Sequence, residues 1–323
     1  MTSPLSTARI LAFRWLVALT SIALVALSAS ACGASSPAGT ASGARTSAIR
    51  VVAAENEYGS VAAQIGGRYV SVTSVESDPN TDPHSYEVSP SVARQVAAAQ
   101  LVIQNGVGYD DFMTKIESAS PSSNRQVITV ARLLGVPEGT PNPHLWYDPA
   151  TMPKVANTLA ADLSKLQPAN ASYFTANAAQ FITSLRPWLT AIATFKARYA
   201  GTPVATTEPV ADYLLQAMGT HNLTPFRFQA DIMNGVDPTP QDVSLENSFF
   251  TGHRVTVLVY NQQVTDSLTE SFIATAKQAN IPVVGVYETM PTPGYDYQSW
   301  MLAEVDALTK AVADHTSTAK LAL

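Results

Sequence analysis

Cysteine is almost absent from this 323-residue chain, in which Cys32 is the only one. A single cysteine excludes an intramolecular disulfide, so the folded protein must take its stability from a packed core. It also excludes a set of soft thiolate ligands. Any protein metal site in the chain must therefore be built from imidazole and carboxylate groups.

Positive charge is also scarce. The chain has 19 lysines and arginines against 25 aspartates and glutamates, a formal net charge of −6. Two of the basic residues, Arg9 and Arg14, belong to the extreme N-terminal segment. Nucleic-acid-binding proteins need a basic face for the phosphate backbone, so we expect no nucleic-acid partner. Mild acidity is compatible with attracting a cation, but it is weak evidence for any function.

No apolar run reaches the roughly 20 residues that a membrane-spanning helix needs. The longest candidate, residues 16–27, follows two arginines without an acidic residue and ends in small residues before Cys32. This pattern predicts a secretory signal peptide over residues 1–31. The position of Cys32 resembles that of the lipidated first residue of mature bacterial lipoproteins, which predicts an extracytoplasmic protein held at the cell membrane by a lipid anchor. The alternative is ordinary cleavage near Ala31, with Cys32 incidental.

Beyond the signal peptide, the pattern predicts an α/β protein with two lobes. Residues 32–48, rich in Gly, Ala, Ser and Thr, are expected to be a flexible tether. Short β-branched runs alternate with helical patterns, which favours mainly parallel sheets of about four strands in each of two lobes, 49–148 and 202–323. The expected strands are residues 50–54, 70–76, 101–104, 127–130, 203–207, 223–228, 255–260 and 282–287. The expected helices are residues 58–66, 91–99, 109–118, 210–218, 241–250, 265–278 and 298–312.

Residues 149–201, between the two lobes, show no strand pattern. One helix is expected over 149–166 and a second from Pro168 to about Tyr199, with aromatic and aliphatic residues at helical spacing. Pro187 lies within the second helix and should kink it or split it in two. This long helix predicts a stiff connection between the lobes.

Two of the five histidines stand out by their local sequence. His84 lies in Asp-Pro-His-Ser-Tyr-Glu, residues 82–87, directly after an expected strand, and His144 lies in Asn-Pro-His-Leu-Trp, residues 142–146, directly before an expected helix. Both follow a proline and have aromatic neighbours. Ligands of open α/β sheets bind in loops beyond the carboxyl ends of the strands, and both loops fit that position. His221, His253 and His315 are expected at the surface.

Two carboxylates of the second half also follow expected strands, namely Glu208 and Glu288. Each has an ordinary structural explanation. Glu208 precedes a helix whose N-terminal dipole a carboxylate would stabilise, and Glu288 could simply be a loop residue at the edge of the sheet. The residues alone leave these alternatives open.

The chain resembles the bacterial zinc and manganese ABC-transporter solute-binding proteins, a group that includes adhesin-like lipoproteins. The resemblance covers residues 49–315. It rests on residues 51–59, on the Asp-Pro-His-Ser-Tyr-Glu motif, on Asn-Gly-Val-Gly-Tyr-Asp at 105–110, and on the Asn-Pro-His motif. The resemblance implies a metal-binding protein, not an enzyme, that delivers its ion to a permease and its ATPase. We expect a monomer.

The resemblance also implies the ligand set. His84 and His144 would come from the first lobe, and Glu208 and Glu288 from the second. Zinc-type members often have a histidine-rich loop between the first two motifs, and this chain has no histidine between His84 and His144. Two histidines and two carboxylates suit Mn²⁺ or Fe²⁺ as well as Zn²⁺. The cargo is therefore expected to be one of these three ions.

Two other functions use similar residues. A metal-dependent hydrolase would need an open coordination position and a general base. The sequence contains neither a His-Glu-x-x-His motif nor a Gly-x-Ser-x-Gly turn, which argues against the common hydrolase classes. A surface adhesin on the same scaffold is the other alternative.

Overall fold

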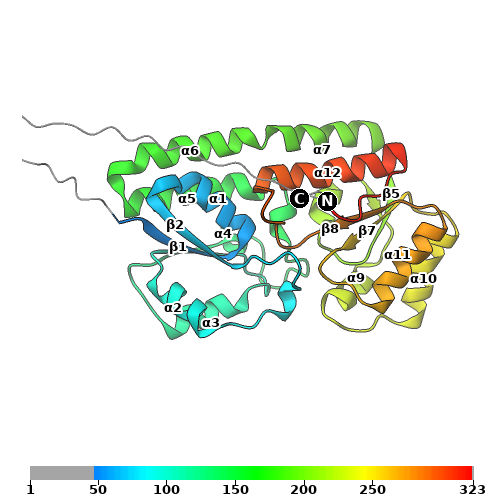
Figure 1. Ribbon diagram of the computed structural model, residues 1–323, viewed down its shortest axis with the longest axis horizontal. Helices are drawn as coiled ribbons and strands as arrows, with labels where there is room; N and C mark the ends of the chain where they lie inside the picture. The colour runs from blue at the N-terminus through cyan, green and yellow to red at the C-terminus, as the bar shows by residue number, and fades with distance from the viewer. Residues whose placement is uncertain (1–46, 322–323) are drawn as a thin grey trace, which may run out of the picture. The chain divides into compact units, whose positions relative to one another are not determined.

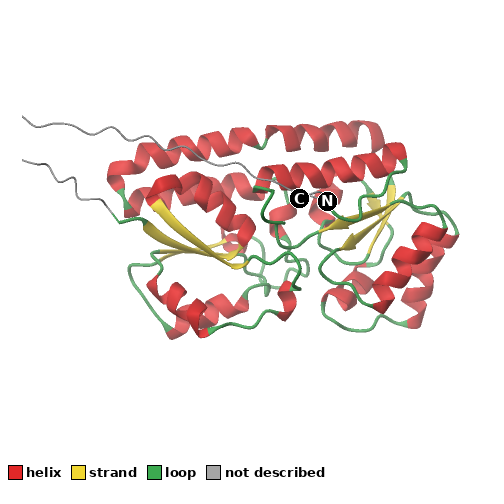
Figure 2. Ribbon diagram, in the orientation of Figure 1, coloured by secondary structure: helices red, strands yellow, loops and turns green. Residues whose placement is uncertain are grey.

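The computed structural model describes residues 47–321. The predicted signal peptide, Cys32 and nearly all of the predicted tether lie outside the described residues. Among the helices described, none is both long and apolar enough to cross a bilayer. The described part of the chain forms two parallel sheets with covering helices (Figures 1 and 2), which confirms the predicted two-lobed α/β class.

The first sheet has the order β2-β1-β3-β4, and all of its pairs are parallel. Alternate residues of the central strand β1 point to opposite faces, as the pleat of a strand requires. Val51 and Ala53 pack into one apolar cluster, and Val52 and Ala54 into another. The four strands confirm the prediction to within one or two residues: β1 (Ile49–Glu55), β2 (Val70–Glu76), β3 (Leu101–Gln104) and β4 (Gln126–Thr129).

The helices of the first lobe cover both faces of this sheet. Helices α2 and α3 lie on one face, and α1 and α4 lie on the other (Figure 1). The prediction missed α4, because its first residue, Val130, was assigned to the preceding strand. Gly135 ends this short helix in a left-handed conformation, with φ of 74°. The bounds are α1 (Asn56–Gly66), α2 (Pro90–Ala98), α3 (Asp111–Ala119) and α4 (Val130–Leu134).

The second sheet repeats this topology, with the order β6-β5-β7-β8 and parallel pairs throughout. Its central strands are buried on both faces, so they read as continuous apolar runs and not as an alternating pattern. The bounds are β5 (Pro203–Thr206), β6 (His221–Asn222), β7 (Val257–Asn261) and β8 (Val283–Val286).

The strand predicted over residues 223–228 is wrong. The edge strand β6 contains only His221 and Asn222, and residues from Phe226 onward form helix α9 (Phe226–Met233). The apolar run suggested a strand, but Phe228 and Ile232, which are four residues apart, form the buried face of a helix. Pro225 precedes the first turn of that helix, where a missing backbone N–H costs little.

The other predicted helices of the second lobe are confirmed. Helices α11 and α12 each begin at an aspartate whose carboxylate caps the first turn, Asp266 and Asp296. Their bounds, with those of the two remaining helices, are α8 (Asp212–Met218), α10 (Pro240–Thr251), α11 (Ser267–Gln278) and α12 (Tyr297–Asp314).

The segment between the sheets is helical, as predicted, and comprises α5 (Thr151–Leu166), α6 (Ala171–Ser184) and α7 (Arg186–Tyr199). The predicted interruption at Pro187 is confirmed, since α6 ends just before Leu185 and α7 carries Pro187 in its first turn. Figure 1 shows α6 and α7 running end to end across both lobes. Helix α6 contacts α1 and α5 of the first lobe, and α7 contacts α8 and α12 of the second.

One apolar core joins the two lobes. The same continuous cluster of buried side chains contains Val51 and Ile103 from the first sheet, Val204 and Val257 from the second, and Trp188 from the connecting helices. Separating the lobes widely would expose part of this core to water, at about 25 cal/mol for each Å² of apolar surface. The fold therefore favours small movements between the lobes.

Candidate metal centre

The loop after β2 carries His84 toward the second lobe. Residues Pro83–Ser85 form a single 3-10 turn, and Pro83 fixes the backbone at its first position. The Asp82 carboxylate accepts a hydrogen bond from the His84 backbone N–H at 2.9 Å and so caps the turn. The His84 side chain stays 23% exposed. The turn therefore places an imidazole at the boundary between the protein interior and solvent.

His144 is completely buried at the start of the 3-10 turn Leu145–Tyr147. The Asn142 side chain holds its ring. Nδ2 of Asn142 donates to the Pro209 carbonyl at 2.9 Å, and Oδ1 lies 2.8 Å from Nδ1 of His144 and accepts from the His144 backbone N–H. These bonds orient the amide with its oxygen toward the ring, so Nδ1 of His144 must carry a proton. In the neutral ring, Nε2 then holds a lone pair.

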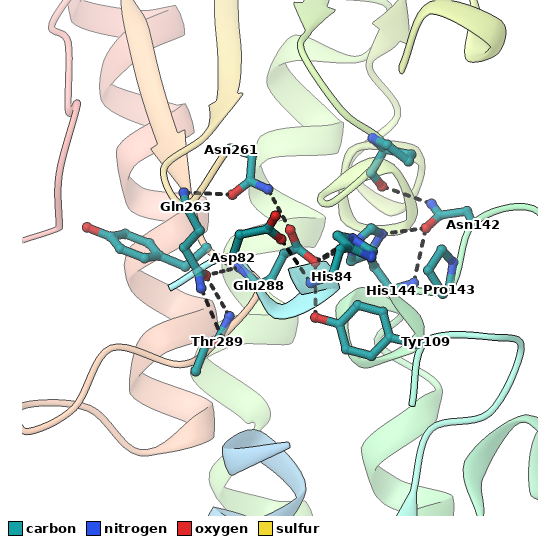
Figure 3. Close-up of polar contacts among 12 residues, drawn as sticks. Asp82, His84, Tyr109, Asn142, Pro143, His144, Asn261, Gln263, Glu288 and Thr289 are labelled. Carbon is teal, nitrogen blue, oxygen red and sulfur yellow. Dashed lines mark hydrogen bonds and ion pairs between the residues drawn. The ribbon is translucent and has the colours of Figure 1, made fainter. Parts of the chain in front are cut away.

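Glu288 follows β8 and meets both histidines (Figure 3). Its Oε2 atom lies 3.1 Å from Nε2 of His84 and 3.1 Å from Nε2 of His144, and it accepts a hydrogen bond from the Tyr109 hydroxyl at 3.0 Å. Its Oε1 atom accepts from the Asn261 side-chain amide. The carboxylate of the second lobe is thus the point on which first-lobe donors converge.

The turn at residues 105–110 brings Tyr109 to this point. The Asp110 carboxylate accepts hydrogen bonds from the backbone N–H groups of Asn105 and Gly106, the latter at 2.8 Å. Gly106 and Gly108 adopt φ of 86° and 81°, a region that side chains strongly disfavour. The glycines of this motif are therefore required by a tight turn that presents the tyrosine.

The geometry demands a positive charge between His144 and Glu288. A lone pair on Nε2 facing a carboxylate oxygen at 3.1 Å is repulsive unless a proton or a cation lies between them. Burial by itself would raise the pKa of Glu288, but hydrogen bonds from His144 and His84 outweigh burial and hold that pKa well below its ordinary value. Glu288 is therefore an anion in a buried pocket of neutral and positive donors.

The two histidines differ in their electrostatic surroundings. Burial lowers the pKa of His144, and the hydrogen bond to Glu288 offsets this only in part. Burial also acts to lower the pKa of His84, but the hydrogen bond and charge of Glu288, together with the charge of Asp82, raise it overall. The surroundings therefore favour the protonated form of His84 more than that of His144.

The structure brings three of the four expected ligands together, and Glu208 is the fourth. Ligand atoms of His84, His144 and Glu288 all lie within 4.8 Å of one another, and no other set of three His, Cys, Asp or Glu residues within 47–321 does so. Glu208 is outside this set, in the loop between β5 and α8. It is 3% exposed. Burial, and then the charge of Glu288, raise its pKa well above the ordinary value, and a hydrogen bond with the Asn261 side chain offsets this rise only in part.

The remaining histidines lie away from this cluster, as expected. His221 is exposed on the edge strand β6, and His253 is exposed in the turn after α10. His315 is exposed at the C-terminal cap of α12.

Sequence reasoning gave no role to four residues that shape the cluster. Tyr109 and Asn142 lie within two of the motifs that carry the family resemblance, and that position was the available signal. Asn261 is the last residue of β7, and Gln263 lies in the loop that follows it. Their position at the carboxyl end of a central strand was the only indication.

Gln263 connects the cluster to both lobes. Its Oε1 atom accepts hydrogen bonds from the backbone N–H groups of Glu288 and Thr289, at 2.7 and 2.8 Å. Its Nε2 atom donates to the carbonyl of Thr81, in the loop that carries His84, at 2.8 Å. A single side chain therefore holds the two ligand-bearing loops in register.

Two parallel α/β lobes that meet at two histidines and a carboxylate define a two-lobed α/β protein with the donor set of a metal site. The chain matches the family model described as zinc-uptake complex component A, periplasmic (ZnuA), over residues 51–311. This match covers most of the chain, and the protein belongs to that family.

Curated relatives match over shorter stretches. The manganese-binding lipoprotein MntA of Bacillus subtilis is 28% identical over 144 residues, which cover 43% of this chain and 47% of the relative. The MntA of Halalkalibacterium halodurans is 27% identical over 167 residues, which cover 51% and 54%. The chain thus spans about half the length of these relatives.

Solved structures match over nearly their full length. FpvC from Pseudomonas aeruginosa in complex with Mn²⁺ has a TM-score of 0.67 and 22% identity, and the match covers 83% of this chain and 99% of that one. A periplasmic metal binding protein from Candidatus Liberibacter asiaticus has a TM-score of 0.64 and 20% identity, with 82% and 99% covered. At these identities the likeness shows a shared fold.

Proposed function

We propose that this chain captures one divalent transition-metal ion, Zn²⁺, Mn²⁺ or Fe²⁺, between its lobes and delivers it to an ABC importer. The observation that carries the proposal is the convergence of Nε2 of His84 and Nε2 of His144 on one oxygen of Glu288, each at 3.1 Å. A bound cation would replace a proton between these atoms and would be coordinated by both imidazole nitrogens and the carboxylate oxygen.

The proposed ligands are His84, His144, Glu288 and Glu208. The Asn142 amide already selects the tautomer of His144 that presents a lone pair to the ion. Glu208 is a buried carboxyl whose pKa is raised by the nearby charge of Glu288. A cation would compensate the two neighbouring carboxylates, which supports Glu208 as the fourth ligand.

Two imidazoles and two carboxylates form a donor set of intermediate hardness. Such a set accepts Mn²⁺, Fe²⁺ and Zn²⁺, since carboxylates suit Mn²⁺ while imidazole suits iron and zinc. The two MntA relatives are named as manganese-binding lipoproteins. Their names support Mn²⁺ as the first ion to test.

Proton competition sets the expected pH dependence of binding. Each histidine must be neutral to bind the ion, and the pKa of His84 is raised in the metal-free protein. Metal affinity should therefore fall as pH decreases, beginning at a higher pH than for an ordinary histidine. Capture should release protons.

Delivery requires a permease and its ATPase, which we propose as partners of a monomeric, extracytoplasmic binding protein. The shared apolar core favours small lobe movements, so the importer would need to act on the contacts between the lobes to release the ion. We further propose lipidation of Cys32 as the membrane anchor. Loss of the protein from the membrane fraction in a Cys32→Ser variant would support the anchor.

The function is tested by metal content and affinity. Wild type, His84→Ala and Glu208→Ala would be stripped of metal, titrated calorimetrically with Mn²⁺ and Zn²⁺, and analysed by mass spectrometry for bound metal. Loss of a direct ligand should cost more than the roughly 10–100-fold that follows removal of an outer partner. His253→Ala, which removes an exposed histidine, is the matched control and should bind as wild type does.

Wild-type protein that binds no first-row metal tightly would contradict the proposed function. Unchanged affinity in Glu208→Ala, with affinity lost in His84→Ala, would remove Glu208 from the ligand set and leave the function standing.

A further inference from the structure

A cavity of about 150 Å³ lies next to the metal centre. Most of its lining comes from residues 75–86, the segment that joins the end of β2 to the His84 loop, and Thr289 completes it from the second lobe. Asp82 and Pro83 of the lining immediately precede His84, and Thr289 immediately follows Glu288. The cavity is thus bounded by both ligand-bearing loops.

The exposed fractions of the three clustered side chains indicate that an ion from solvent would enter on the side of His84. The side chains of His144 and Glu288 are 0% exposed, whereas that of His84 is 23% exposed. An incoming ion must therefore meet His84 before the other two donors. The cavity wall is continuous in sequence with His84, so an ion inside the cavity would already be at this accessible edge.

The charges around the cavity favour a cation. Glu76, Asp78 and Asp82 contribute to the lining, and no lysine or arginine does. Glu76 is 5% exposed, and neither of its carboxylate oxygens has a hydrogen-bond partner in the described structure. A buried polar group without a partner is costly, and a cation in the cavity would supply one. Asp78, which also lines the cavity, is exposed to solvent.

We propose that this cavity is an entry vestibule, in which Glu76 and Asp82 hold the incoming divalent cation before it passes His84 into the metal centre. The proposal rests on the proposed metal-capture function and assigns it a route. It gives Glu76, which is outside the ligand set, a role in the rate of capture.

The Glu76→Gln variant tests this role. Burial, and then the charges of Glu57 and Asp110, raise the pKa of Glu76 to about 9. The carboxyl therefore carries a proton in the metal-free protein at neutral pH, and Glu76→Gln copies the shape and hydrogen-bonding of that state. The variant should fold normally but cannot exchange a proton for a cation.

The experiment is stopped-flow binding of Mn²⁺ to the metal-free full chain, followed by tryptophan fluorescence. Trp146 lies with its ring centroid 5.4 Å from that of His144 and reports directly on the centre. Glu76→Gln should lower the association rate constant by about tenfold, because the amide cannot release a proton and so cannot become an anionic partner for the passing ion. The dissociation rate constant should fall in parallel, because entry and exit use the same route, so Kd should change little.

Two further variants complete the test. Asp78→Asn, which alters an exposed residue and poses little risk to folding, should lower the association rate and weaken its dependence on salt. Asp237→Asn removes an exposed carboxylate of the second lobe, away from the cavity, and should leave both rate constants unchanged.

An association rate unchanged in Glu76→Gln would overturn the vestibule, as would a change in Kd carried by dissociation alone. Wild-type protein that shows no Mn²⁺ binding at equilibrium would instead contradict the proposed function itself, so the two failures are distinguishable.

Discussion

The side-chain amide of Asn142 determines which nitrogen of His144 faces the other ligands. Its oxygen accepts from Nδ1 of His144, and its nitrogen donates to the Pro209 carbonyl of the second lobe. The same residue thus sets a tautomer and joins the loops that carry His144 and Glu208. Removing a partner of this kind typically costs a metal site roughly 10–100-fold in affinity.

We expect Asn142→Ala to weaken metal affinity by roughly 10–100-fold, because the ring of His144 loses its orientation and its preferred tautomer. Calorimetric titration of Mn²⁺ measures the change. Asn142→Asp, which keeps an acceptor for Nδ1 of His144, should recover part of the affinity. Asn234→Ala removes an exposed asparagine and serves as the control; equal affinities in all four proteins would contradict the orienting role.

Glu246 is a buried carboxyl far from the candidate ligands in the sequence. It lies on α10, is 1% exposed, and accepts a hydrogen bond from the Thr224 hydroxyl at 3.0 Å. Burial raises its pKa to about 8. Because the folded protein binds this proton more tightly than the unfolded chain does, the proton contributes stability that is complete below about pH 4.5. That contribution is lost progressively as pH rises to about 8.

Glu246→Gln should therefore be nearly as stable as wild type near pH 5 and more stable near pH 8.5, by about 4 kcal/mol. Urea unfolding of the metal-free proteins at both pH values measures the difference. Glu270→Gln, at an exposed position on α11, should show no such divergence. A constant stability difference between Glu246→Gln and wild type across this range would refute the assigned pKa.

At the scale of elements, the paired helices α6 and α7 connect the lobes mainly through packing. Trp188 of α7 is 1% exposed, and its ring packs edge-on against Tyr297 of α12 with centroids 5.9 Å apart. Tyr297 in turn donates to the Trp146 carbonyl at 2.6 Å, next to His144. Through Tyr297, the connecting helices are therefore linked to the backbone next to His144.

Trp188→Ala should lower the free energy of unfolding by about 3–5 kcal/mol, the usual cost of deleting a large buried aromatic side chain. Its chain neighbour Leu189 is 40% exposed, so Leu189→Ala should cost less than about 1 kcal/mol. Chemical denaturation of both variants gives the comparison. Similar losses in the two would show that α7 is not packed as described.

At the scale of the whole described molecule, the metal centre is also a contact between lobes. Gln263 bonds to the backbone at Glu288 and Thr289 in the second lobe and to Thr81 in the first. These bonds act together with the convergence of His84 on Glu288. The contacts that hold the two loops together therefore also hold the candidate ligands together.

Gln263→Ala should leave all ligands present but reduce metal affinity by about tenfold or more, because the two loops lose their shared register. Hydrogen exchange at the backbone amides of Glu288 and Thr289 should accelerate in the same variant. The adjacent Gln262→Ala is the matched control, since its side chain bonds to Tyr260 and not across the lobes. Unchanged exchange at residues 288 and 289 would contradict the bridging role.

The sequence by itself determined most of the elements, because their information is local. Buried parallel strands are short β-branched runs, and Pro187 interrupts a helix wherever it stands within one. His84 and His144 were recognisable from the residues beside them. The prediction failed where a local pattern is compatible with two structures. The apolar residues of the run ending at Phe228 suit a strand as well as a helix, and in the folded protein they pack as the buried face of α9.

Only the tertiary structure decided how the candidate site is assembled. His144 meets Glu288 across 144 positions of sequence, and no pattern within either loop states that distance. The roles of Asn142, Asn261 and Gln263 depend on which atoms face one another after the lobes close. Local periodicity follows from backbone geometry, which each segment carries by itself. Contacts between lobes follow from the packing of a shared core, which exists only when the whole chain has folded.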